Sequence, residues 1–243
     1  MEGWKMQSAL GVLYPPQCVS CDAPTDANFA LCGQCWRETP FVEGLVCDLC
    51  GDPLPGEDDG TPAHCDACLA ANRPWQQGRA AMVYDGNARR LVLALKHGDR
   101  PELARAAAPW LVRSAIPLTC PDTLIVPMPI HWTRLLRRRY NQSAELARFL
   151  ARALNIKHIP DALQRTKRTR PHDGMDIDAR FANMQGAIGP HPKRGGSLAG
   201  RKVLLLDDVM TSGASFDAAT RACFAAGADH VNVLTLARVT RGA

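Results

Sequence analysis

Four Cys-x-x-Cys pairs between residues 18 and 68 constrain how this chain can fold more than any other feature. They contain eight of its ten cysteines: Cys18, Cys21, Cys32, Cys35, Cys47, Cys50, Cys65 and Cys68. Each such turn lets two thiolates converge on one cation, and two turns complete the tetrahedral four-sulfur shell typical of structural zinc. Ten residues separate the first two pairs and fourteen the last two. We therefore predict two structural zinc ions held by sequential pairs, with interleaved pairing as the alternative.

The segment 1–75 that carries these pairs is rich in Gly, Pro and Asp and has few aliphatic runs. Because it cannot bury a useful core, metal must supply the folding energy, and structural zinc contributes roughly 10 to 16 kcal/mol in finger peptides. Redox chemistry is the alternative, but thioredoxin-like motifs use one such pair near a βαβ unit. Closed four-thiolate shells also leave no position for a catalytic water. We predict a double zinc ribbon at 1–75, with Cys120 and Cys223 as ordinary buried residues.

From about Gln77 the chain shows the alternating strands and helices of an α/β domain, which we place at 76–243. Strands are predicted at 79–86, 123–129, 202–206 and 230–239, and helices at 87–98, 101–114, 141–155 and 216–228. A basic loop follows the second strand, and a long polar stretch occupies 165–188. The last strand, helix and strand form a βαβ unit, which predicts a central, mostly parallel sheet.

Polar residues concentrate where the strand at 202–206 turns toward the next helix: Asp207, Asp208, Thr211, Ser212, Gly213, Ala214 and Ser215. Ligands of open α/β sheets bind at the carboxyl ends of the strands, where a helix N-terminus offers unpaired N–H groups to a phosphate. Two carboxylates would repel that phosphate, so we assign them to the hydroxyls of an attached ribose. Both can reach one sugar only if the turn begins at Asp207, because neighbouring side chains of a strand alternate. The alternative is that Asp208 or Ser212 only caps the helix.

The net charge of +5 is too small to indicate nucleic acid by itself, but basic residues cluster at 134–139 and 165–170. These runs either contact phosphates or form solvated surface. We expect no signal peptide, and no apolar stretch long enough to span a membrane occurs in the sequence. The expected location is the cytoplasm, where thiols stay reduced and closely spaced cysteines bind metal.

The run LLLDDVMTSGAS resembles the phosphoribosyl pyrophosphate motif of type I phosphoribosyltransferases. The whole arrangement resembles the ComF family of competence-associated proteins, in which a double zinc ribbon precedes such a domain. The resemblance includes the cysteine pairs, YDGNARRLVLALKHG, VPMPIHWTRLLRRRYNQSAELA, RTKRTRPH with ARFANMQGAI, and the final βαβ unit, and so spans almost the whole chain.

This resemblance implies roles for particular residues. Asp207 and Asp208 would hold the ribose hydroxyls, and the residues from Thr211 to Ser215 the 5′-phosphate. Arg139, Tyr140 and Asn141 would form the pyrophosphate loop, and 165–188 a mobile hood over the site. The family pattern Arg-Gly-Phe-Asn-Gln stands here as Arg139, Tyr140, Asn141, Gln142, so one glycine is missing and the register of this loop is open.

The resemblance implies a part in DNA uptake during natural transformation, with a phosphorylated ribose, single-stranded DNA and DNA-uptake proteins as partners. The alternative is an active phosphoribosyltransferase that uses phosphoribosyl pyrophosphate and Mg²⁺ bound at Asp207, Asp208 and the basic loop. No signature identifies its nucleophile, so the sequence leaves enzymatic activity undecided. A pure scaffold is the third hypothesis. Binding of DNA through Lys and Arg would weaken steeply with salt.

Overall fold

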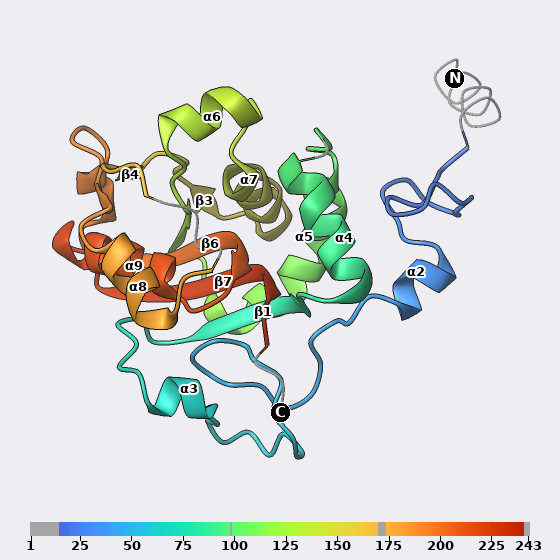
Figure 1. The fold of residues 1–243 in the computed structure, drawn as a ribbon, viewed down its shortest axis with the longest axis horizontal. Coiled ribbons are helices and arrows are strands. Elements are labelled where there is room, and N and C mark those ends of the chain that lie inside the picture. The colour runs from blue at the N-terminus through green and yellow to red at the C-terminus, as the bar shows by residue number, and fades with distance from the viewer. Residues whose placement is uncertain (1–14, 98, 170–173, 241–243) are drawn as a thin grey trace.

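The computed structural model describes residues 15–97, 99–169 and 174–240, and its centre is a five-stranded sheet (Figure 1). The spatial order is β1 (Gly78–Val83), β7 (His230–Arg238), β6 (Lys202–Met210), β2 (Thr123–Pro127) and β3 (Lys157–His158). All four pairings within this sheet are parallel. The predicted α/β fold with a mostly parallel sheet is therefore confirmed.

Helices cover both faces of the sheet (Figure 1). One face carries α4 (Gly86–His97), α5 (Leu103–Ala115) and α7 (Gln142–Leu154). The other carries α9 (Ala214–Ala225), α8 (Ile177–Met184) and the antiparallel pair β4 (Leu163–Arg165) and β5 (Ile188–Pro190). Alternation along β6 builds both cores, because Leu204 and Leu206 join the first core while Val203 and Leu205 join the second.

The two ribbons pack on opposite faces of this sheet. The first, which contains α2 (Gly33–Arg37), places Val19 in the core shared by α4 and α5. The second, which contains α3 (Asp66–Leu69), places three of its cysteines in the core shared with α9. Backbone hydrogen bonds also join the ribbons to the sheet edge, from Val42 N to Ala81 O and from Gly78 N to Asp48 O. The division of the chain at residue 75 stays a prediction.

Two stretches to which the sequence analysis gave no secondary structure form regular elements. The basic stretch predicted as a loop forms α6 (Trp132–Arg138), because Leu and Arg favour helix and His131 Nδ1 caps it by accepting from Thr133 N. Within the polar stretch 165–188, α8 begins at the capping carboxylate of Asp176, and β5 pairs with β4. The sequence did not predict these elements because they are too short to show a hydrophobic periodicity, and capping or strand pairing stabilises them instead.

The connections define where a ligand crevice must lie. From β2 the chain crosses through α7 to β3, whereas from β6 it crosses through α9 on the opposite face to β7. The strand order thus reverses between β2 and β6, and open α/β sheets bind ligands at such a point, beyond the carboxyl ends of the strands. Short 3₁₀ turns, Ile116–Leu118 and Gly195–Leu198, complete the fold. No helix in the described ranges is long and apolar enough to cross a membrane.

Candidate functional site

The eight cysteines of the N-terminal pairs form two separate four-sulfur clusters. The first consists of Cys18, Cys21, Cys32 and Cys35, and the second of Cys47, Cys50, Cys65 and Cys68. Within each cluster the four Sγ atoms lie within 4.8 Å of one another. This arrangement favours sequential over interleaved pairing, and four thiolates without a carboxylate are the donor set of structural zinc. Zinc bound there would supply folding energy and no open coordination position.

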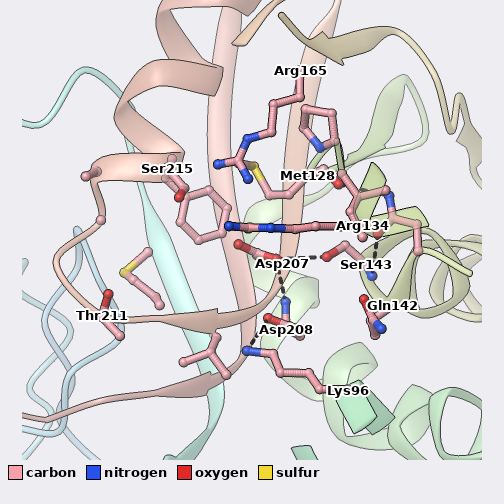
Figure 2. Close-up of a pocket in the computed structure, with 18 of the residues that line it drawn as sticks. Lys96, Met128, Arg134, Gln142, Ser143, Arg165, Asp207, Asp208, Thr211 and Ser215 are labelled. Carbon is pink, nitrogen blue, oxygen red and sulfur yellow. Dashed lines mark hydrogen bonds and ion pairs between the residues drawn. The ribbon is translucent and has the colours of Figure 1, made fainter. Parts of the chain in front are cut away.

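A cavity of about 270 Å³ opens between the carboxyl ends of β2 and β6 (Figure 2). All seven residues predicted to bind the ribose phosphate line it: Asp207, Asp208, Thr211, Ser212, Gly213, Ala214 and Ser215. The cavity therefore lies at the point where the strand order reverses, and one segment of sequence supplies one of its walls.

Both carboxylates line the cavity although β6 continues to Met210, so the turn does not begin at Asp207 as the sequence analysis required. The reason lies in the neighbouring strand. Beyond the pair Pro127 and Leu206, β2 leaves the sheet, and the β2 side of β6 becomes open to the cavity. Both acids can therefore reach this space from a strand that is still paired with β7 on its other side.

Different elements hold the two carboxylates. Asp207 Oδ1 accepts hydrogen bonds from Ser143 Oγ of α7 at 2.8 Å and from Asp208 N at 2.9 Å. Asp208 Oδ1 lies 3.1 Å from Lys96 Nζ at the end of α4 (Figure 2). Burial, together with the charge of Asp208, raises the pKa of Asp207 to about 7. Asp207 is thus an acid poised to gain or lose a proton near neutrality.

The segment from Thr211 to Gly213 has the features of an anion-binding loop. Among the described residues, none accepts a hydrogen bond from the N–H groups of Thr211, Ser212 or Gly213. Gly213 adopts φ 84° at the start of α9, a conformation that suits glycine. Ser212 Oγ does accept from Ala214 N at 3.4 Å, so a capping role coexists with the free amides. Asp208 makes no such cap, because Lys96 holds it elsewhere.

Three arginines of the two basic runs line the cavity, and the sequence analysis had not singled them out: Arg134, Arg138 and Arg165. Figure 2 shows Arg134 and Arg165 converging over Asp207, opposite Lys96. Burial and the nearby charge of Arg134 lower the pKa of Arg165. Arg165 Nη2 approaches the sulfur of Met184 at 3.1 Å, and its buried Nε has no acceptor among the described residues. A bound anion would supply the missing acceptors on this side of the cavity.

The three residues predicted for the pyrophosphate loop are placed differently from one another. Asn141 lines the cavity, caps α7 and donates to Met128 O at 3.0 Å. Tyr140 does not line it, because its hydroxyl donates to Leu95 O. The side chain of Arg139 is 81% exposed, faces Asp99 and also lies outside the lining.

The backbone accounts for this placement and for the open register. Arg139 has φ 65°, a left-handed conformation that favours glycine. It therefore stands where the family pattern has its glycine, and Arg138 stands where the pattern has its arginine. Arg138, one residue before the arginine that the sequence analysis named, is therefore the one that lines the cavity. The hood residues 170–173 lie outside the described residues.

Comparisons with known proteins agree with this architecture. The double zinc ribbon domain family matches residues 9–69. DNA utilization protein YhgH of Escherichia coli is 29% identical over 231 residues, which cover 92% of this chain and 97% of that protein. Competence protein F of Haemophilus influenzae is 26% identical, over 91% of this chain and 96% of its own length. The predicted resemblance to the ComF family is confirmed.

Solved structures similar to this chain include two phosphoribosyltransferases. One is glutamine phosphoribosylpyrophosphate amidotransferase from B. subtilis, with 15% identity and a TM-score of 0.40, covering 59% of this chain and 30% of that chain. The other is a hypoxanthine phosphoribosyltransferase from Staphylococcus aureus, with 10% identity and a TM-score of 0.32, covering 60% of this chain and 69% of that chain. These scores are low, so the fold class rests on the parallel sheet, its strand order and the ribbons.

Proposed function

We propose that the cavity binds a phosphorylated ribose of the phosphoribosyl pyrophosphate type and that the protein acts in the handling of DNA during its uptake. The free amides at Thr211, Ser212 and Gly213 beside two carboxylates are the observation that carries this proposal. A phosphate would accept from these N–H groups, and the ribose hydroxyls would donate to Asp207 and Asp208. The loop and the acids thus fit the two ends of one ligand.

The arginines on the opposite wall fit a second anionic group. Arg138 and Arg165 each have a buried Nε without an acceptor among the described residues. A pyrophosphate on the ribose anomeric carbon would accept from them, because one guanidinium group can donate two parallel hydrogen bonds to phosphate oxygens. Mg²⁺ would fit between this group and the carboxylates, since it binds carboxylate and phosphate oxygens together.

A role with DNA is supported by the names of the two relatives and by one surface. Trp132 on α6 is 65% exposed and stands in a helix that also carries Arg134 and Arg138. Exposed aromatic side chains beside basic residues stack on the bases of single strands. We propose that single-stranded DNA contacts α6 at the mouth of the cavity, with DNA-uptake proteins as further partners.

Titration calorimetry with phosphoribosyl pyrophosphate and Mg²⁺ tests the ligand. Binding is expected to be tighter at pH 8 than at pH 6, because Asp207 has a raised pKa near 7 and accepts most strongly when ionised. Ribose 5-phosphate without Mg²⁺ serves as the control for metal effects. No binding heat at either pH, with the protein folded and loaded with zinc, would contradict the proposal.

The same samples distinguish binding from catalysis. The arginines facing the proposed pyrophosphate favour phosphoribosyl transfer as the second candidate function, with these side chains neutralising the departing group. Pyrophosphate release is therefore followed with and without single-stranded DNA. Release that requires the protein and intact Asp207 would show turnover. Saturable binding without release would indicate a binding module.

Two neighbouring arginines provide a matched test of the loop register. Arg138→Ala is expected to weaken phosphoribosyl pyrophosphate binding by about 10- to 100-fold, the value of one hydrogen bond to a charged group. Arg139→Gly is expected to leave this affinity unchanged and to relieve roughly 1 kcal/mol of left-handed strain. Calorimetry and thermal unfolding measure the two effects. The opposite pattern, with affinity lost only in Arg139→Gly, would contradict the assignment of Arg138 and indicate that Arg139 contacts the ligand.

A further inference from the structure

Two arginines connect the second cysteine cluster to the anion-binding loop. Arg238, at the end of β7, donates through Nη1 to the carbonyl oxygens of Met210 at 3.3 Å and of Thr211. Its Nη2 lies 3.8 Å from Cys50 Sγ. Arg73, which follows the last cysteine pair, donates through Nη1 to Ser212 O at 2.9 Å. Three successive carbonyls, from Met210 to Ser212, thus accept from arginines that contact the second ribbon, and Met210 O also accepts from Val239 N at 2.9 Å.

These contacts determine the direction of the free amides. In a trans peptide the C=O of one residue and the N–H of the next point in opposite directions. When the carbonyls of Met210, Thr211 and Ser212 point toward the arginines, the N–H groups of Thr211, Ser212 and Gly213 point away from them. Those are the three amides that have no acceptor among the described residues and whose residues line the cavity.

The buried positive charge of Arg238 needs a negatively charged partner, and the second cysteine cluster can provide one. The residue is 2% exposed, and its Nε is buried without an acceptor in the described chain. No carboxylate of residues 15–97, 99–169 or 174–240 forms an ion pair with it. A buried charge without a partner is costly, and Cys50 Sγ is the acidic group it contacts. Four thiolates around one zinc ion carry a net negative charge that offsets the guanidinium.

Arg73 is tied to the same ribbon by a second route. Its guanidinium lies over the Trp75 ring, 5.4 Å from the centroid. The indole N–H of Trp75 donates to Leu49 O at 2.6 Å, inside the third cysteine pair. The position of Arg73, and with it Ser212 O, therefore follows the conformation of the metal-binding turn. Arg73 packs so closely on Gly213 that a side chain at this position would not fit, since a Cβ on Gly213 would lie 2.9 Å from Arg73 Nη1.

We propose that Arg73 and Arg238 are positioning residues through which the second metal cluster holds the loop at 211–213 in its anion-binding conformation. The identity of the ligand, a ribose phosphate, rests on the proposed function, whereas the role of the two arginines in the loop conformation does not. The ribbon then acts as the support of the binding site, and loss of its metal disorders the loop. The first cluster lies on the other face of the sheet and contacts α4 through Ser20 and Asn87.

The first test replaces Arg73, which is less buried than Arg238 and therefore less critical for folding. Arg73→Met is expected to keep two zinc ions per chain by elemental analysis and to bind ribose 5-phosphate at least about tenfold more weakly. Amide hydrogen exchange over residues 210–216 is expected to accelerate. Arg73→Lys should restore part of the affinity, because its ammonium can still donate to Ser212 O. Unchanged exchange and affinity in Arg73→Met would overturn the proposal.

Arg79→Met is the matched control. Arg79 also contacts the second ribbon, through Asp48 at 2.5 Å, but it makes no contact with the loop. Its replacement is expected to change neither exchange at 210–216 nor ribose phosphate affinity. Equal acceleration in Arg79→Met and Arg73→Met would show general loosening of the ribbon and overturn the assignment of Arg73.

Cys50→Ser tests the metal itself. This variant is expected to contain one zinc ion fewer than the wild type, to exchange rapidly at 210–216 and to lose ribose phosphate binding. Slow exchange at 210–216 after loss of that zinc ion would overturn the proposal. If the wild-type protein binds no ribose phosphate, the proposed function fails, whereas the exchange measurements still decide the inference.

Discussion

Replacement of both Asp207 and Asp208 by alanine is expected to abolish binding of ribose 5-phosphate and phosphoribosyl pyrophosphate. Each carboxylate is proposed to accept from a ribose hydroxyl, and one hydrogen bond to a charged group is worth about 1.5 to 3 kcal/mol. Loss of both therefore lowers affinity by more than about 100-fold. Calorimetry measures the effect, and single-strand affinity in a filter-binding assay should remain because α6 is unchanged.

Two controls make this experiment specific. Inorganic phosphate has no sugar hydroxyls for the acids to hold, so its affinity for the variant should not fall, and the freed Lys96 even favours it. Asp161→Ala removes another carboxylate, one that pairs with Arg194 at 3.1 Å and lies outside the cavity lining. It should bind ribose phosphates as the wild type does. Wild-type affinity in the double variant would remove the assignment of this site.

Two zinc ions per chain are expected by elemental analysis, and their removal is expected to unfold the ribbons. Zinc binding to four thiolates contributes roughly 10 to 16 kcal/mol in small peptides, which is as large as the usual stability of a whole domain, about 5 to 15 kcal/mol. Chelation should therefore change the near-ultraviolet circular dichroism of Trp36 in the first ribbon and of Trp75, which is buried beside the second. The sheet should keep its far-ultraviolet signal, because strands and helices of the α/β domain supply most residues of its two cores.

Cys120→Ser is the matched control for the zinc experiment. Cys120 belongs to neither cluster, and its Sγ lies 3.5 Å from Thr123 Oγ1. The variant should retain both ions, whereas Cys21→Ser should lose the first. A zinc count of zero in the purified wild-type protein would refute the ribbon interpretation.

Several features were determined by local sequence alone. The fixed spacing of the cysteine pairs predicted both metal clusters, because two thiolates three residues apart meet on one ion without help from the rest of the chain. The helix at 141–155 was predicted to close at Asn155, which has φ 53° there. The strand, turn and helix from 202 to 228 were predicted because their residues are contiguous. For the same reason the loop at 211–215 was assigned to the cavity that it lines.

Tertiary structure decided which side chains from distant elements face this loop. Lys96 lies in the last turn of α4, Ser143 in the first turn of α7 and Arg165 at the end of β4, yet all three line one cavity. Their positions depend on how helices pack across the sheet, and hydrophobic periodicity reports which face of an element is buried, not which neighbour it meets. The same limit applies to Arg139, which has a left-handed backbone and lies outside the cavity, whereas Arg138 lines it. It applies also to Arg73 and Arg238, since only the packing of the second ribbon under the loop brings the second cysteine cluster close to residues 211–213.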